Sequence, residues 1–338
     1  MDARADARPA ETSAATRAPA LTAGRAILLA GLVVAVALPF VAKSFLIFQL
    51  TLVLVYAIAI CGLNLLTGFN GQFSLGHGAF YALGAYTAAI LMEHGNVPYL
   101  WTIPAAGAVC FVAGFLFGLP ALRLEAIYLA LATFALAIAA PQIFKLSPLE
   151  HWTGGNQGIV ILKPDAPFGL PLNQDQWLYF LTLSVALVMF WAAHNIVRSR
   201  TGRAIMAIRD NPIAARSMGV DTALYKTLTF GVSALYTGVA GALGAIVVQF
   251  VAPDSFNVSL SIAFLVGLVV GGVGWIPGAL FGGLFVLFVP NIAEHISKGL
   301  SGAAYGAILI LLIYLMPSGV GGLFHLLARR LGRLRRTR

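Results

Sequence analysis

Long apolar runs, separated by short polar or glycine-rich stretches, recur along the whole chain. A helix needs about 20 mostly apolar residues to cross a membrane, whereas a membrane β-barrel shows alternating segments of roughly ten residues. The runs here are of the first kind, and they predict an all-α integral membrane protein with about ten transmembrane helices. The expected helices lie at residues 26–42, 45–66, 77–93, 99–119, 124–145, 177–197, 223–250, 259–273, 276–297 and 303–317.

The amino-acid composition supports the same class. Apolar residues make up 59% of the 338 residues and charged residues only 10%, against roughly 25% charged residues in a soluble domain. The two cysteines, Cys61 and Cys110, lie inside apolar runs, so we expect small buried side chains there. The sequence shows no metal or redox constellation, and we expect no cofactor in this chain.

The positive charges predict how the helices are oriented. If the N-terminus lies inside the cell, only Lys43, Lys145, Lys163 and Lys298 of the 21 Lys and Arg residues fall in segments on the outer side. Membrane proteins keep their positive charges inside, so we expect both termini to be cytoplasmic. The net charge of +9 is then explained by cytoplasmic loops beside anionic lipid, and no nucleic-acid partner is needed.

The parts outside the apolar runs are two tails and two longer loops. Residues 1–25 are rich in Ala, Arg, Thr and Pro and are expected to form a disordered cytoplasmic tail. A cleaved signal peptide is the alternative, because "AVA" at 35–37 resembles a cleavage box, but the long charged lead favours an uncleaved first span. The other expected parts are a transmembrane domain at 26–317, with an external loop at 146–176 and a cytoplasmic loop at 198–222, and a basic cytoplasmic tail at 318–338.

Residues 64–86, "NLLTGFNGQFSLGHGAFYALGAY", interrupt the apolar pattern on the expected cytoplasmic side. A broken helix frees backbone groups, and transporters often place sites at such breaks. Polar groups in a membrane must line a path or find partners. Two interpretations stay open, a cargo path or gate and a structural role in which glycines allow close packing. The candidate path residues are Asn64, Gln72, Ser74 and His77, with Tyr128 and Thr133 on the fifth expected helix.

A second glycine-rich stretch, "VVGGVGWIPGALFGG" at 269–283, again joins two expected helices on the inner side. We interpret the two stretches as paired elements of an internal repeat. The glycines expected to permit the two breaks are Gly68, Gly71, Gly76, Gly78, Gly272 and Gly274.

The cytoplasmic loop contains a short helix with recognisable ends. Asn211 can cap its N-terminus, Pro212 suits the first helical position, and Gly219 can end it in a left-handed conformation. Such a helix can dock into a groove of another protein, while the alternative is a solvated basic loop that only fixes topology. In the docking interpretation, small side chains allow close approach and charged ones lie at the rim. These residues are Ala214 and Ala215, and Arg209, Asp210 and Arg216.

Several stretches resemble one family of transport proteins. "IAARSMG" at 213–219 resembles the EAA-type loop of bacterial ABC importer permeases, although Ile213 stands where a Glu is common. The longer "GRAIMAIRDNPIAARSMGVDTALYK" is similar to the form found in permeases for branched-chain amino acids. Three further stretches resemble the same family. They are residues 64–86, "RLEAIYLALATFA" at 123–135 and "TGGNQGI" at 153–159. The matches run in order from about residue 45 to 317 and resemble the larger of that importer's two permease subunits.

The resemblance implies an ABC importer permease fold and a place in the bacterial cytoplasmic (inner) membrane. It implies three kinds of partner: a second permease, two ATP-binding subunits that dock on the short cytoplasmic helix, and an extracytoplasmic solute-binding protein. ATP would be hydrolysed by the partners, because Lys43-Ser44 and Lys226-Thr227 lack the glycine-rich lead of a phosphate-binding loop. We expect alternating access, with residues 209–219 passing ATPase movement to the spans.

Three other functions remain open from the sequence. The same machine could carry urea, short amides or other amino acids. A stand-alone secondary transporter would need an ionisable group at mid-membrane, but Glu93, Glu125 and Glu294 lie near helix ends. A scaffolding membrane protein would not need a capped cytoplasmic helix or broken spans.

Overall fold

The computed structural model describes residues 18–122, 124, 126–167, 172–296, 301–316 and 318–322. The chain divides into two compact units, Met1–Lys43 and Ser44–Arg338. Most of the two predicted tails, residues 1–17 and 323–338, lies outside the described residues.

In the first unit, α1 runs from Ala18 to Val41. The helix therefore begins before residue 26, and the last part of the predicted disordered tail is helical. Ala and Leu favour a helix at these positions, and a proline such as Pro19 is tolerated in the first turn.

The second unit is built from helices, and each of the ten predicted segments of the chain is helical. Its long helices are α2 (Ser44–Leu63), α3 (His77–Glu93), α4 (Tyr99–Ala121), α5 (Ala126–Phe144), α7 (Gln174–Arg198), α10 (Thr222–Val248), α11 (Val258–Gly271), α12 (Gly278–Ile296) and α13 (Ser301–Leu315). Its short helices are η1 (Asn64–Phe69), η2 (Ser147–Leu149), α6 (Glu150–Thr153), α8 (Arg200–Asp210), α9 (Pro212–Ser217) and η4 (Pro253–Phe256).

Six helical stretches in the described part of the chain are long and apolar enough to cross a membrane. They are Ser44–Phe69, Tyr99–Ala121, Ile127–Phe144, Gln174–Arg198, Thr222–Val248 and Pro253–Gly271. Two further apolar helical stretches are shorter, Ala30–Val41 in α1 and Gly278–Glu294 in α12. The helical class is thus confirmed, and the number of ten transmembrane helices stays a prediction.

Helix α10 lies at the centre of the core and packs against α2, α3 and α4. Small residues make the crossings close, as membrane helices commonly do. A side chain at Gly84 of α3 would meet the backbone of Gly238 in α10, and a side chain at Gly238 would meet Cys110 of α4. Cys61 and Cys110 are both buried and free, as the sequence predicted.

We expect the substitution Gly84→Ala to destabilise the fold. The added Cβ would lie 2.6 Å from the Cα of Gly238, and such overpacking typically costs about 1–3 kcal/mol. A thermal melt of the purified protein should therefore shift to lower temperature. Gly306→Ala on α13 is the matched control, because an added Cβ meets nothing within 4 Å there; equal melting of both variants would contradict this account of the crossing.

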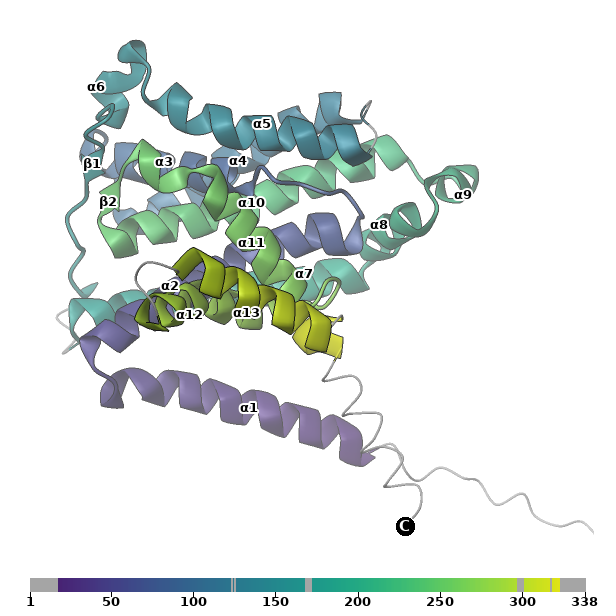
Figure 1. The fold of residues 1–338 in the computed structure, drawn as a ribbon, viewed down its shortest axis with the longest axis horizontal. Helices are drawn as coiled ribbons and strands as arrows, with labels where there is room; N and C mark the ends of the chain where they lie inside the picture. The colour runs from purple at the N-terminus through teal and green to yellow at the C-terminus, as the bar shows by residue number, and fades with distance from the viewer. Residues whose placement is uncertain are drawn as a thin grey trace, which may run out of the picture. The chain divides into compact units, whose positions relative to one another are not determined.

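Within the second unit, α8 and α9 lie at one end of the long helices, and α6 and the strands β1 (Ile159–Val160) and β2 (Phe250–Val251) lie at the other (Figure 1). The strands pair antiparallel, with Ile159 opposite Val251. This ladder of two residues per strand leaves the all-α class unchanged. It arises because the external loop pairs with the short extended stretch after α10, where Gln249 turns the chain with a φ of 66°.

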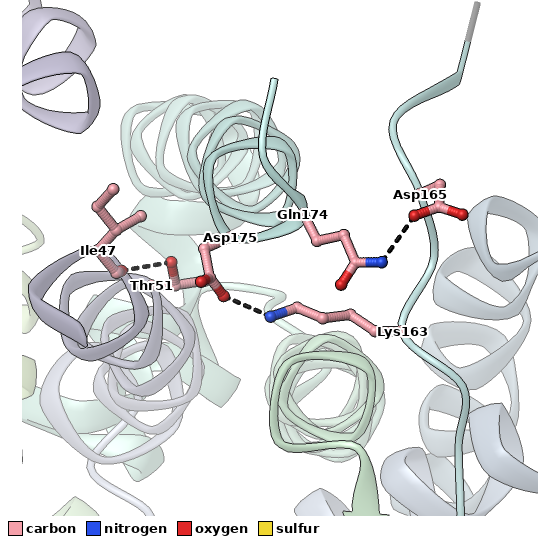
Figure 2. Close-up of polar contacts among 6 residues, drawn as sticks. All are labelled: Ile47, Thr51, Lys163, Asp165, Gln174 and Asp175. Atoms are coloured by element: carbon pink, nitrogen blue, oxygen red, sulfur yellow. Dashed lines mark hydrogen bonds and ion pairs between the residues drawn. The ribbon is translucent and has the colours of Figure 1, made fainter. Parts of the chain in front are cut away.

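Polar contacts hold the end of the external loop against the start of α7. Lys163 forms an ion pair with Asp175, and the Gln174 Nε2 donates to Asp165 Oδ1 at 2.6 Å (Figure 2). On the neighbouring helix α2, the Thr51 hydroxyl donates to the carbonyl of Ile47 (2.8 Å). The first two contacts hold Lys163 and Asp165 against the start of α7.

Candidate functional site

After α2 the chain forms a short π-helix and then an extended stretch. Residues Asn64–Phe69 form the π-helix η1, and Gly71 then reverses the chain with a φ of 74°. The extended run leads to His77, where α3 begins. π-Helical turns are uncommon and often mark functional sites. We call residues 64–77 the break segment.

Asn64 joins the break segment to the second glycine-rich stretch. Its Oδ1 accepts from the Gly274 N–H (2.9 Å), and its Nδ2 donates to the Trp275 carbonyl (3.0 Å). The side chain is 1% exposed, so one buried amide uses both its acceptor and its donor on backbone groups of the second stretch. The two stretches that we paired from the sequence therefore meet in space.

The glycines of these two stretches allow the close approach. A side chain at Gly68 would overlap Asn64 Oδ1 and approach the Gly274 nitrogen to 2.7 Å. Gly274 itself has a φ of 76°, a conformation that costs little only for glycine. The other predicted glycines are also at close contacts or turns: Gly76 faces Thr133, Gly78 faces Ser261, and Gly272 has a φ of 111°.

Arg209, at the end of α8, links the cytoplasmic-loop helices to the break segment. Its Nη1 donates to the carbonyl of Gly68 (3.0 Å). Its guanidinium also pairs with Asp210, at 3.0 Å from the Oδ1. A second link runs from Gln72, whose Nε2 donates to the carbonyl of Lys226 in α10 (3.1 Å). The break segment is thus attached to both sides of the cytoplasmic loop.

His77 lies in a buried chain of hydrogen bonds. Ser233 donates to the carbonyl of Gly62 (2.6 Å) and contacts His77 Nε2 (2.7 Å), while Ser74 contacts His77 Nδ1 (3.1 Å). Because the Ser233 hydroxyl proton is used by Gly62, Ser233 accepts from Nε2–H, and a neutral ring accepts from Ser74 at Nδ1. The ring is therefore held between α2, α3 and α10.

Two further hydroxyls fix the start of α3. Thr133 of α5 accepts from the Leu75 N–H (2.9 Å), and Ser261 of α11 accepts from the Gly78 N–H (2.9 Å). These bonds satisfy backbone groups at a helix N-terminus, which otherwise lack partners. The start of α3 is thus hydrogen-bonded to two neighbouring helices, α5 and α11.

The structure brings together most of the predicted path residues. Asn64, Gln72, Ser74, His77 and Thr133 are buried around the break segment. Tyr128 is separate, because it is 60% exposed on α5. The bonds of Asn64, Ser74 and His77 support the structural interpretation, whereas Gln72 lines a cleft; cargo contact by any of these residues stays a prediction.

The sequence reasoning missed three residues of this site: Asn70, Ser233 and Ser261. Ser233 and Ser261 are single hydroxyls in apolar helices, and the signal that could have found them is their isolation among apolar neighbours. Asn70 directly precedes Gly71 in the break itself.

The short helix of the cytoplasmic loop has the predicted ends. Asn211 Oδ1 accepts from the N–H groups of Ile213 and Ala214 (both 3.0 Å), Pro212 is the first helical residue, and Gly219 has a φ of 82°. We call residues 209–219 the coupling segment. One expectation is wrong: Ala215 is 5% exposed, so it packs inward and does not lie on the outer face.

The exposed face of the coupling segment includes two large apolar side chains. Ile213 is 78% exposed, and Met218 is also exposed. Exposed apolar side chains on a projecting helix are typical of protein contacts. Across the described part of the chain, no three His, Cys, Asp or Glu side chains gather as a metal site would require.

Comparison with known proteins identifies related chains. Residues 45–316 match the family model described as "Branched-chain amino acid transport system / permease component". The LivM proteins of Salmonella typhimurium and Escherichia coli, named as high-affinity branched-chain amino acid transport system permease proteins, are each 31% identical to this chain over 87% of it and 74% of their own length. LivH of Escherichia coli, with the same description, is 26% identical over 79% of this chain and 91% of its own length. No solved structure matches.

Proposed function

Because this chain belongs to the permease-component family of branched-chain amino acid transport systems, we propose that it forms the transmembrane path of an ATP-driven importer for branched-chain amino acids. The observation that carries the mechanism is the Arg209–Gly68 hydrogen bond. It joins a projecting, capped helix to a broken span. A movement of that helix would therefore reach the break segment directly.

The proposed machine has four kinds of part. Two ATP-binding subunits dock on the coupling segment at Ile213 and Met218. A second, related permease completes the path; the similarity to both LivM and LivH supports a pair of related chains. A solute-binding protein docks at the opposite end, near α6 and β1. The complex lies in the bacterial cytoplasmic membrane, with the coupling segment and both termini inside, as the positive charges indicate.

The path alternates between two access states in this proposal. Gly68, Gln72 and Asn64 of the break segment are each hydrogen-bonded to another part of the second unit. Packed networks tend to switch between discrete arrangements rather than deform gradually. ATP binding in the partners would shift the coupling segment, and Arg209 and the Gln72–Lys226 contact would carry the shift to α2, α3 and α10.

The test is uptake by the complete transporter in proteoliposomes. The chain is purified with its partners, ATP is enclosed, and labelled leucine is offered with its binding protein. We expect ATP-dependent uptake that excess isoleucine or valine suppresses and excess urea or acetamide does not. Suppression by urea alone would identify the alternative cargo, and uptake without any ATP-binding subunit would show a secondary transporter instead.

A further inference from the structure

Three exposed arginines lie where α7 ends and α8 begins. Arg198 is the last residue of α7, and Arg200 and Arg203 lie in the first turn of α8. None of the three forms an ion pair in the part of the chain that the structure describes. The first turn of α8 also holds no acidic residue, although a helix N-terminus favours negative charge. We call residues 198–203 the basic turn; it is a cluster of cations that lacks an anion.

The basic turn is held in place by contacts between the two helices. The Ser199 Oγ accepts from the Gly202 N–H (3.3 Å), and a side chain at Gly202 would overlap the carbonyl of Val197. The Arg203 Nη1 donates to the carbonyl of Arg198 (3.4 Å). The end of α7 and the start of α8 are therefore close together, and so are the arginines that they carry.

The length of α7 indicates the depth of the basic turn in a membrane. A helix of 25 residues is about 37 Å long, whereas the hydrocarbon core of a bilayer is about 30 Å thick. Trp191, two turns before Arg198, is 68% exposed, and tryptophan is enriched at the boundary between membrane and water. The basic turn therefore lies at the level of the lipid headgroups when α7 crosses the bilayer.

We propose that the basic turn binds the phosphate group of an anionic phospholipid. The guanidinium group of arginine stays charged and can bind two phosphate oxygens at once. A lipid fits this surface better than a soluble anion or an acidic protein, because the exposed Trp191 and the apolar surface of α7 continue from the arginines into the membrane. The bound lipid ties the start of α8 to the membrane surface.

This lipid surface is separate from the coupling segment. Arg209, where the coupling segment begins, lies nine residues beyond Arg200 on the same helix, which is about 14 Å along its axis. A lipid at the basic turn therefore leaves Ile213 and Met218 accessible to the proposed partners.

Four variants test the surface. Arg203→Gln removes one cation from the basic turn, and a double variant also carries Arg200→Gln. Arg203→Lys keeps the charge and loses the planar group that binds two oxygens. Arg216→Gln is the matched control, because it removes one exposed arginine from α9. These side chains are exposed, so the changes break no internal packing.

The readout is quenching of Trp191 fluorescence by brominated lipid. The assembled transporter is placed in phosphatidylcholine nanodiscs that hold a small share of brominated phosphatidylglycerol or the same share of brominated phosphatidylcholine. The Trp191 signal is the difference between each protein and the same protein carrying Trp191→Phe. We expect phosphatidylglycerol to be favoured by roughly tenfold or more in the wild type and in Arg216→Gln. The preference should fall about fivefold in Arg203→Gln, less in Arg203→Lys, and nearly vanish in the double variant.

Several results would overturn the proposal. These are equal quenching by the two brominated lipids in the wild type, and an unchanged preference in the double variant. If inorganic phosphate removes the preference while chloride at the same ionic strength does not, the basic turn takes a soluble anion instead. A preference that appears only after the ATP-binding subunits are removed would assign the arginines to a protein contact. The measurement needs neither cargo nor ATP, so its result is independent of whether the chain imports amino acids.

Discussion

Replacing Asn64 with alanine is expected to abolish leucine uptake and to lower the free energy of unfolding by about 2 kcal/mol or more. The change leaves the Gly274 N–H without its bond to Asn64 and removes one of the two bonds to the Trp275 carbonyl, which still accepts from the Gly278 N–H. Each lost partner of a buried backbone group costs roughly 1–3 kcal/mol. Because this one side chain joins the two breaks, their relative position is no longer fixed.

The measurement is a thermal melt together with uptake in proteoliposomes. Asn64→Asp should fall between the wild type and alanine, since it keeps the acceptor for Gly274 and loses the donor to Trp275. Thr182→Val, which removes a buried hydroxyl outside this junction, should melt near the wild type. An Asn64→Ala protein that transports leucine at the wild-type rate would show that the junction has no functional part.

Replacing Ile213 with glutamate is expected to abolish ATP-driven uptake while the chain remains folded. Ile213 is exposed at the projecting end of the coupling segment, so the change breaks no internal packing. Burying a charge in a protein contact is unfavourable, and loss of a central apolar contact typically costs 2 kcal/mol or more of binding free energy. We expect the ATP-binding subunits to dissociate from the complex.

The measurement is copurification of the ATP-binding subunits with the chain. Leu162→Glu is the matched control: Leu162 is likewise an exposed apolar residue, but it follows β1 at the opposite end of the unit. It should retain the ATP-binding subunits fully. Ala215 is unsuitable for this test because it is buried. Retention of the subunits by Ile213→Glu would place their docking surface elsewhere.

The sequence predicted the helices well because apolar runs of this length have few other solutions in a membrane. It also predicted the ends of the coupling segment, since Asn211, Pro212 and Gly219 act on their own immediate backbone. Such local rules need no knowledge of distant residues. The predicted start of α1 is too late because residues 18–25 belong to a stretch whose Ala, Arg, Thr and Pro content predicted a tail, although they are helical.

The long-range contacts could not be predicted from these patterns. That Asn64 bonds to residues 274 and 275, and that Arg209 bonds to Gly68, depends on how α2, α8 and α11 pack. The sequence likewise could not predict that the Asn70 side chain is buried without a hydrogen-bond partner among the described residues, because that depends on its three-dimensional surroundings. The glycines in both stretches did indicate close packing, because a side chain on either side of the junction would keep the two backbones apart.

The central claim is that Arg209 transmits ATPase movement to the break segment. The direct test is the number of leucine molecules imported per ATP hydrolysed in Arg209→Met, which keeps an apolar stem beside Gly71 and removes the donor to Gly68. Arg216→Met, at an exposed position on α9, is the control. We predict that Arg209→Met retains the ATP-binding subunits and hydrolyses ATP but imports far less leucine per ATP than the wild type or the control. An unchanged ratio in Arg209→Met would contradict the account.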